Sequence, residues 1–236
     1  AIDRTSRQVV TIDPASRRII ARVGLAGSPD YVRYVGPTRE LWVTEPDSER
    51  IEIFRISSNR DALTHAAFIS VPDGPESLVI DPAAGRAFTH LWSGMSLAID
   101  IRSRKIVARW PNGCSGSRGI AYDARSQFLF AGCAEGKAVV LDPAHDGAVL
   151  ATATAGNGVD IIDYDPVRRH LYLPGARSAT MTIFAVAANG SLTPLATTAT
   201  ASGAHCVVTD GKDAYVCDPN RGRILVVHDS YPAAKE

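Results

Sequence analysis

The chain lacks a net charge and lacks long hydrophobic runs. It has 25 Lys and Arg residues against 25 Asp and Glu residues, so its formal charge at pH 7 is zero. A nucleic-acid-binding protein normally carries a basic excess, and a membrane-surface protein a polybasic segment, so neither class is expected. No apolar run approaches the ~20 residues that a transmembrane helix needs, and we therefore expect no membrane span.

The sequence also lacks the short motifs of several large enzyme classes. It contains no G-x-x-x-x-G-K-[ST], no H-E-x-x-H, no G-x-S-x-G and no G-x-G-x-x-G. This removes the usual sequence evidence for nucleotide, zinc-protease, hydrolase and dinucleotide sites. The four cysteines include no C-x-x-C pair, which argues against a thiolate metal site. We therefore predict no metal and no cofactor.

What the chain does have is an internal repeat. Five segments share a short lead-in that is small or contains Pro, then an apolar stretch, a polar turn and a second apolar stretch. They begin at Ser28, Gly74, Ser117, Gly158 and Gly203. The starts lie 46, 43, 41 and 45 residues apart. The apolar runs are short, rich in β-branched and aromatic residues and bounded by Asp-Pro, Gly-Lys or Asp-Gly turns, which indicates strands.

Four strands repeating every 41–46 residues are typical of β-propeller blades. We predict an all-β fold, a β-propeller of four-stranded antiparallel blades, in one domain over residues 1–236. The predicted parts are a partial blade at 1–27, repeats at 28–73, 74–116, 117–157, 158–202 and 203–229, and a tail at 230–236. Two strands before the first repeat, four in each of four repeats and three in the last repeat make 21 strands. Six blades are favoured and five remain an alternative.

A stretch of the first repeat resembles a known family. Residues Leu41–Glu45 (LWVTE) are similar to the Leu-Tyr-Val-Thr-Asn signature of the YVTN-type β-propellers. The Ile-Asp or Leu-Asp ending of the third strand, at Ile12-Asp13, Ile99-Asp100 and Leu141-Asp142, is similar to that family too. These motifs are structural and carry no reaction. The resemblance implies a surface or periplasmic β-propeller. Members of this family often have no assigned reaction.

The four cysteines form two pairs that lie close along the chain. Cys206 and Cys217 are opposite one another if the Gly211-Lys212 turn joins their strands, and Cys114 and Cys133 lie on one face of the same blade. We predict two disulfides, with four reduced, packed thiols as the alternative. Oxidised pairs would place the protein in a periplasm or outside the cell. No signal peptide is present, so we expect a mature or trimmed chain.

Charged residues recur at one position of the repeat. The beginnings of the first strands carry Asp30, Glu76, Arg118, Asp160 and His205, and the ends of the second strands add Glu45, His90 and Asp218. In a propeller these positions converge at the mouth of the central channel, where ligands often bind. The alternative is a solvated ring of paired charges.

Arg118 decides which ligand we predict. Carboxylates could hold Ca²⁺ through oxygen, and calcium- or zinc-dependent lactonase propellers use a central acidic and amide cage. This chain has no Asn at the aligned positions, and a guanidinium in the ring repels a cation. We therefore expect a non-catalytic, monomeric protein that binds a small anionic molecule or a protein partner. A metal-dependent hydrolase or lyase, with Glu76 or Asp160 as base or ligand of Ca²⁺ or Zn²⁺ and His205 as proton shuttle, remains open.

Overall fold

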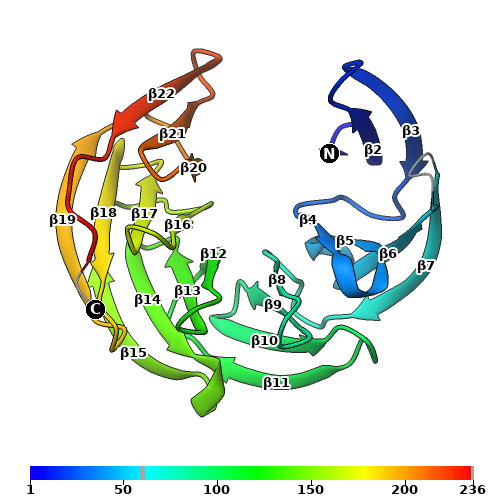
Figure 1. The fold of residues 1–236 in the computed structure, drawn as a ribbon, viewed down its shortest axis with the longest axis horizontal. Helices are drawn as coiled ribbons and strands as arrows, with labels where there is room; N and C mark the ends of the chain where they lie inside the picture. Colours follow the sequence, from blue (N-terminus) through cyan, green and yellow to red (C-terminus); the bar gives the residue numbers. More distant parts are fainter. Residues whose placement is uncertain (59–61, 235–236) are drawn as a thin grey trace. The chain divides into compact units, whose positions relative to one another are not determined.

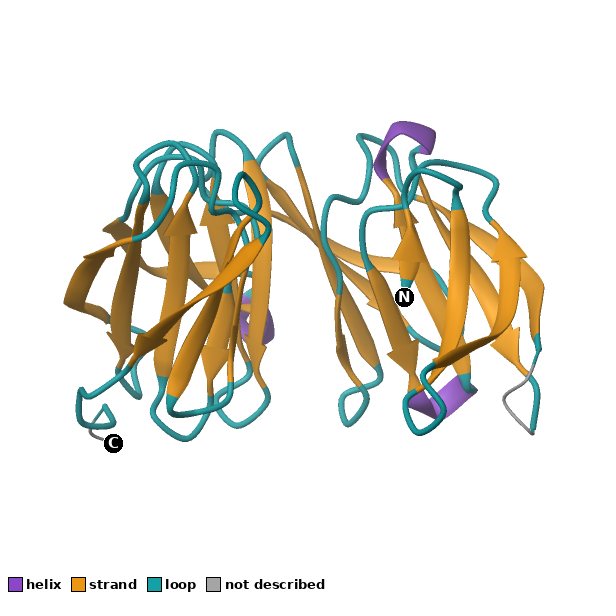
Figure 2. Cartoon of the chain, turned by 90° about the horizontal axis from the view of Figure 1, so that it is seen from above, coloured by secondary structure: helices purple, strands orange, loops and turns teal. Residues whose placement is uncertain are grey.

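The computed structural model describes residues 1–58 and 62–234, and these residues are almost entirely strand and turn. Figure 2 shows that helix is confined to short 3₁₀ turns, which are η1 (Gly36–Thr38), η2 (Pro46–Ser48) and η3 (Pro143–His145). The described part of the chain has no helix long and apolar enough to cross a membrane. The predicted repeat 28–73 and the predicted tail 230–236 each include residues outside the described ranges.

The first three antiparallel sheets use strands β1 to β11, in sequence order within each sheet (Figure 1). The first sheet contains β1 (Ile2–Asp3), β2 (Gln8–Asp13) and β3 (Arg18–Gly24). The second contains β4 (Val32–Val35), β5 (Glu40–Glu45), β6 (Arg50–Ile56) and β7 (Leu63–Ser70). The third contains β8 (Val79–Asp81), β9 (Arg86–Leu91), β10 (Met95–Asp100) and β11 (Ile106–Pro111).

The other three sheets follow the same pattern. The fourth contains β12 (Ser117–Asp123), β13 (Phe128–Cys133), β14 (Lys137–Asp142) and β15 (Ala148–Thr154). The fifth contains β16 (Asp163–Asp165), β17 (His170–Gly175), β18 (Thr180–Val186) and β19 (Leu192–Ala199). The sixth contains β20 (Val207–Thr209), β21 (Asp213–Asp218) and β22 (Arg223–His228).

Six small antiparallel sheets of this kind are the blades of a six-blade β-propeller, as the repeat predicts. One detail of the prediction is wrong. The described residues form 22 strands rather than 21, because β1 adds a short second strand to the N-terminal sheet. β1 pairs with β2 through Ile2–Val9 and Asp3–Gln8 alone. Two residues are too short to show an apolar pattern, so the sequence could not reveal this strand.

The recurring Asp at the end of a strand closes the following turn. The Asp100 carboxylate accepts the Ser103 N–H at 2.8 Å, and the Asp142 carboxylate accepts the Ala144 N–H at 3.0 Å. Such Asx turns replace ladder hydrogen bonds where the chain reverses. The turn residues Arg104 and Asp146 then have positive φ values of 57° and 53°. The Ile-Asp and Leu-Asp pairs thus end a strand and start its turn.

The chain divides into two compact units, and each packs its own core. The first comprises residues 1–92 and 97–109, and the second residues 93–96 and 110–236. In the second unit, Phe130, Leu171 and Phe184 pack between the fourth and fifth sheets. Tyr172 and Val216 pack between the fifth and sixth. A blade is apolar on both faces of its middle strands, so only a neighbouring blade can bury them.

Candidate functional site

A cavity of about 390 Å³ lies in the second unit, at the ends of three neighbouring blades. β12 lies beside β16 and β16 beside β20, and these strands run from green to orange in Figure 1. The lining residues come from the start of β12, the loops after β13 and β17 and the segments that lead into β16 and β20. They are Arg118, Ala134, Gly158, Val159, Asp160, Ala176, Arg177, Gly203 and His205.

Arg118 is held in the wall by a β-bulge. Ser117 pairs with Cys133 and Gly119 pairs with Gly132, so Arg118 is the extra residue of β12 in this ladder. A bulge bends its strand and re-aims the side chain of the inserted residue. The sequence places Arg118 at the first-strand position of the repeat, and the bulge gives the guanidinium its place in the cavity wall.

Gly119 lets Asp160 approach β12. A Cβ atom on Gly119 would lie 2.3 Å from the Asp160 carbonyl oxygen and 2.7 Å from Ile162 Cγ2. The Asp160 segment is also tied to the next blade, because the Ile161 N–H donates to the His205 carbonyl oxygen at 2.9 Å. The backbone therefore holds Arg118, Asp160 and His205 around one cavity, although Arg118 and His205 are 87 residues apart along the chain.

Positive charge exceeds negative charge in the cavity wall. Arg118 Nη1 lies 4.0 Å from Asp160 Oδ2, an ion pair longer than a hydrogen bond, and the two side chains are about 30% exposed. Arg177 is the second guanidinium, and its Nη2 donates to the Ala134 carbonyl oxygen at 2.8 Å. Two guanidinium groups thus face one carboxylate among the lining residues.

His205 completes the polar part of the wall. Its Nδ1 lies 2.7 Å from the Gly203 carbonyl oxygen, which assigns the proton of a neutral ring to Nδ1. Gly203 itself has a φ of +82°, and the matching lead-in glycines Gly74 and Gly158 have φ values of +75° and +84°. Glycine adopts this conformation without a steric penalty, which explains the small residue that opens these repeats.

The other sequence-predicted site residues are not among the residues that line this cavity. Asp218 belongs to the second unit, is 1% exposed and accepts the Arg223 Nε–H at 2.8 Å, but it does not line the cavity. Asp30, Glu45, Glu76 and His90 belong to the first unit. There Asp30 pairs with Arg4 at 3.0 Å, and the Glu76 N–H donates to the carbonyl oxygen of the fully buried His90 at 2.9 Å.

Glu45 belongs to a buried carboxyl pair on neighbouring strands. Its Oε1 accepts the Gly27 N–H at 2.8 Å, and Glu52 Oε2 accepts the Ala26 N–H at 2.9 Å. Burial, together with the hydrogen bond and charge of Glu45, raises the pKa of Glu52 to about 7. The Ala26 N–H and Arg50 oppose this shift without cancelling it. The pair holds the loop between the first two blades.

The structure brings both predicted cysteine pairs within disulfide distance. The Cα atoms of Cys114 and Cys133 are 5.2 Å apart, and those of Cys206 and Cys217 are 5.5 Å apart. These separations are normal for disulfides. Both pairs lie in the second unit.

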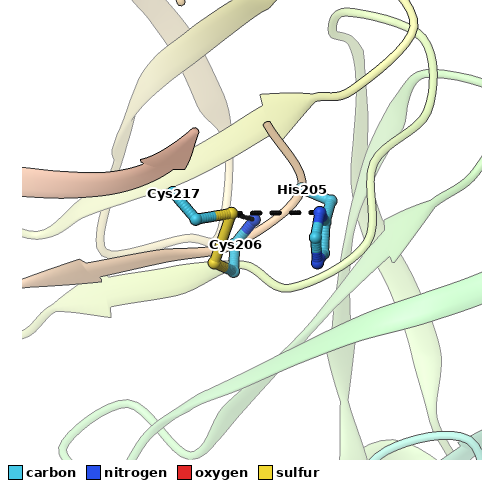
Figure 3. Close-up of side chains that lie close together, drawn as sticks. All are labelled: His205, Cys206 and Cys217. Carbon is cyan, nitrogen blue, oxygen red and sulfur yellow. Dashed lines mark hydrogen bonds between the residues drawn. A yellow bond between two sulfur atoms is a disulfide. The ribbon is translucent and has the colours of Figure 1, made fainter. Parts of the chain in front are cut away.

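Among the described residues, potential metal ligands form two separate groups. They are His205 with Cys206 and Cys217, shown in Figure 3, and Glu135 with Cys114 and Cys133. In each group the ligand atoms lie within 4.8 Å of one another. Glu76 and Asp160, the alternative metal residues of the sequence analysis, belong to different units and to neither group.

Sequence reasoning missed two residues of the second unit. Arg177 follows Gly175, the end of a second strand, by two positions, so a search for cations just beyond that strand end would have found it. His170 resembles a surface residue at a turn but is fully buried, with its Nδ1 2.6 Å from Asp229 Oδ2. No local signal could have shown this, because Asp229 lies 59 residues further on.

Comparisons with known proteins identify the fold alone. No family model and no curated protein matches the sequence. Among solved structures, a protein of unknown function from Desulfotomaculum acetoxidans DSM 771 matches with a TM-score of 0.78 and 13% identity over 96% of this chain and 77% of that one. A chain of the mitotic checkpoint complex matches with a TM-score of 0.77 and 14% identity over 95% of this chain and 69% of that one.

A third solved structure carries the name of an enzyme. A protein from Bacteroides fragilis NCTC 9343, provisionally named 6-phosphogluconolactonase, matches with a TM-score of 0.73 and 14% identity over 89% of this chain and 67% of that one. The resemblance to YVTN-type repeats stays a prediction, since no family model matches. Identities this low show architecture rather than activity. The chain has the fold of a six-blade β-propeller.

Proposed function

We propose that the chain binds a small anionic ligand in the cavity that contains Arg118, Arg177 and His205, and that it does so without catalysing a reaction. The observation that carries this proposal is the excess of guanidinium over carboxylate in the wall. Arg is suited to carboxylate and phosphate groups, because its planar fork donates two parallel charge-assisted hydrogen bonds.

The size of the cavity favours a small molecule over a protein partner. A volume of about 390 Å³ falls in the range of small-molecule pockets. Small side chains such as Ala134, Ala176 and Val159 line the remaining wall and leave the charged groups as the polar anchors. Asp160 then has two uses: it offsets part of the charge when no ligand is bound, and it repels a second anionic group on the ligand.

Titration calorimetry with inorganic phosphate and with succinate tests the proposal. The wild-type protein should bind at least one of these anions. Arg118→Met and Arg177→Met should each weaken this binding at least about tenfold, because a hydrogen bond to a charged group contributes about 1.5–3 kcal/mol. The matched control is Arg102→Met, which removes the same charge from an exposed position in the other unit. Its affinity should equal that of the wild type.

The variants should keep their melting temperatures, because Arg118 is about a third exposed and its ion pair with Asp160 is long. Equal loss of binding in Arg102→Met would mean that net charge, not the cavity, attracts the anion. Absence of phosphate and succinate binding in the wild type would contradict the proposal.

A second candidate is the hydrolysis of a phosphorylated sugar lactone. The provisional name of the Bacteroides fragilis neighbour and the guanidinium groups that suit a phosphate both favour it. Asp160 would then act as base or as ligand of Ca²⁺ or Zn²⁺, with His205 as proton shuttle. Hydrolysis of 6-phosphogluconolactone faster than the uncatalysed rate, lost in Asp160→Asn, would support this candidate over the binder.

We further propose a periplasmic or extracellular location, a monomer, and binding that needs no cofactor. Disulfide bonds persist in oxidising compartments, which supports the location. Alkylation of whole cells before lysis should leave all four cysteines unlabelled. Dialysis against a chelator should leave phosphate affinity unchanged, and light scattering should give a mass near 25.1 kDa.

A further inference from the structure

We propose that Cys206, Cys217 and His205 form a zinc site when the Cys206–Cys217 disulfide is reduced. Two thiolates and an imidazole are the donor set of open, three-ligand zinc sites, in which a water or a substrate takes the fourth position. The proposal does not depend on the anion-binding function.

The geometry brings the three donors together from β21 and the segment that leads into β20. Cys206 directly precedes β20 and Cys217 lies on β21, next to the Val207–Val216 pair of the ladder. The Cys217 N–H donates to the Cys206 carbonyl oxygen at 3.1 Å. Cys217 Sγ lies 3.9 Å from His205 Nδ1 (Figure 3). In a tetrahedral zinc site the sulfur–nitrogen separation is about 3.5 Å, given bonds near 2.3 and 2.0 Å. A small movement of one side chain closes the difference.

A backbone N–H contacts the sulfur of Cys217. The Cys206 N–H lies 3.1 Å from Cys217 Sγ and points its proton at the sulfur. His205 Nδ1, whose proton now bonds the Gly203 carbonyl oxygen, would bind the metal after the ring proton moves to Nε2.

Access separates this pair from the other one. Cys206 and Cys217 are both half-buried, whereas Cys114 is 8% exposed and Cys133 fully buried. Thiol–disulfide exchange needs an attacking thiolate to reach a sulfur atom. Glu135, the third member of the other group, already accepts the Ser115 N–H at 2.8 Å and pairs with Lys137 at 3.3 Å. Cys206–Cys217 is therefore the pair that a reductant opens first.

The two steps balance. A dithiol reductant attacks one sulfur, forms a mixed disulfide and is released as its own disulfide, so that Cys206 and Cys217 gain two electrons and two protons. Zn²⁺ then replaces both thiol protons, which leave to solvent, while the imidazole keeps its proton on Nε2. The site has two thiolate charges that neutralise the dication.

Cobalt titration of the reduced protein tests the site. After mild reduction and removal of reductant under argon, one equivalent of Co²⁺ should produce a near-ultraviolet thiolate charge-transfer band and the visible bands of a tetrahedral complex. Zn²⁺ should abolish both. The double variant Cys206→Ser with Cys217→Ser should show neither band. His205→Ala should bind Co²⁺ at least about tenfold more weakly than the wild type. The matched control, Cys114→Ser with Cys133→Ser, should give the same bands as the wild type.

Alkylation followed by mass spectrometry tests the same site without variants. Mild reduction should add label to Cys206 and Cys217 and not to Cys114 and Cys133, and one equivalent of Zn²⁺ should protect both labelled residues. The proposal is overturned if the reduced wild type gives no thiolate band. It is also overturned if the band survives in the Cys206/Cys217 variant, or if Zn²⁺ leaves the labelling rate of these two cysteines unchanged.

Discussion

One buried carboxyl group, that of Glu52, controls the dependence of folding stability on pH that we expect of this protein. Glu52 is 3% exposed, lies next to the fully buried Glu45 and holds the Ala26 N–H. Its pKa is raised from an ordinary value near 4.5 to about 7, chiefly by burial. Between these two pH values the folded chain therefore keeps a proton that the unfolded chain has lost.

This proton makes stability fall as the pH rises. The contribution of Glu52 is fully present below pH 4.5 and is lost as the pH passes through 7. Glu52→Gln, which mimics the protonated carboxyl, should flatten the dependence of the unfolding free energy on pH and add on the order of 1 kcal/mol at pH 8. Urea denaturation at pH 5 to 8 measures this, with the exposed Asp47→Asn as control. An unchanged slope in Glu52→Gln would refute the assignment.

The residue scale also shows what sequence reasoning could reach. Arg118, Asp160 and His205 occupy one position of the repeat and line one cavity. Alignment of the repeats grouped them, but it also included Asp30 and Glu76, which do not line this cavity. Arg177 is outside that alignment because it follows a strand end by two residues. The buried ion pair of Glu45 with Arg50, at 2.6 Å, could not be predicted either, because a charged residue at a strand end is usually solvated.

At the scale of elements, the spacing between β12 and the Asp160 segment shapes the cavity. Gly119 faces the Asp160 carbonyl oxygen and Gly132, its partner in the ladder, faces Ile162 and Val159, so two glycines form the contact. Their φ values are ordinary, so the requirement is for space rather than for backbone freedom.

Gly119→Ala should therefore disturb the cavity as well as the fold. The new methyl group would overlap the Asp160 backbone, and overpacking of this kind costs about 1–3 kcal/mol. We expect a lower melting temperature together with weaker phosphate binding. Gly24→Ala is the control, because nothing lies within 4 Å of its added Cβ. Wild-type stability and affinity in Gly119→Ala would contradict the packing argument.

A second element-scale feature is the attachment of the C-terminal segment to the fifth blade. The Tyr172 hydroxyl donates to Asp229 Oδ2 at 2.6 Å, and His170 Nδ1 contacts the same oxygen at 2.6 Å. Burial raises the pKa of Asp229, but these hydrogen bonds outweigh burial and hold it below its ordinary value. Arg168 adds a hydrogen bond to the Tyr231 carbonyl oxygen at 2.7 Å.

Asp229→Ala should destabilise the protein by about 2–4 kcal/mol, because it leaves the buried Tyr172 hydroxyl and His170 without their shared acceptor. Thermal unfolding followed by circular dichroism measures the loss. Ser230→Ala, at the exposed neighbouring position, should unfold like the wild type. Equal melting temperatures for Asp229→Ala and the wild type would show that the segment is not anchored through Asp229.

The repeat predicted most of the architecture at the scale of the whole molecule, because each blade repeats the same turn and strand pattern at a nearly constant period. Six blades and the order of strands follow from that pattern, and the Asx turns explain its Asp residues. The repeat pattern does not predict how the disulfides are distributed between the two units. Both disulfides lie in the second unit, and the first contains no cysteine.

Full reduction should therefore loosen one unit and spare the other. Each bridge closes a short loop and contributes about 2–3 kcal/mol by restricting the unfolded chain. Hydrogen exchange measured by mass spectrometry should show faster exchange in β12–β15 and β20–β22 after reduction, and unchanged exchange in β4–β7. A uniform increase over both units would contradict this assignment.

The central claim is that the cavity at Arg118 and Arg177 receives an anion. The most direct measurement is the anomalous difference density of selenium in crystals soaked with selenate, an analogue of phosphate and sulfate. We predict a selenium peak in this cavity, within hydrogen-bond reach of both guanidinium groups, and no such peak in crystals of Arg118→Met. An empty cavity in soaked wild-type crystals, or a peak that persists unchanged in the variant, would contradict the account.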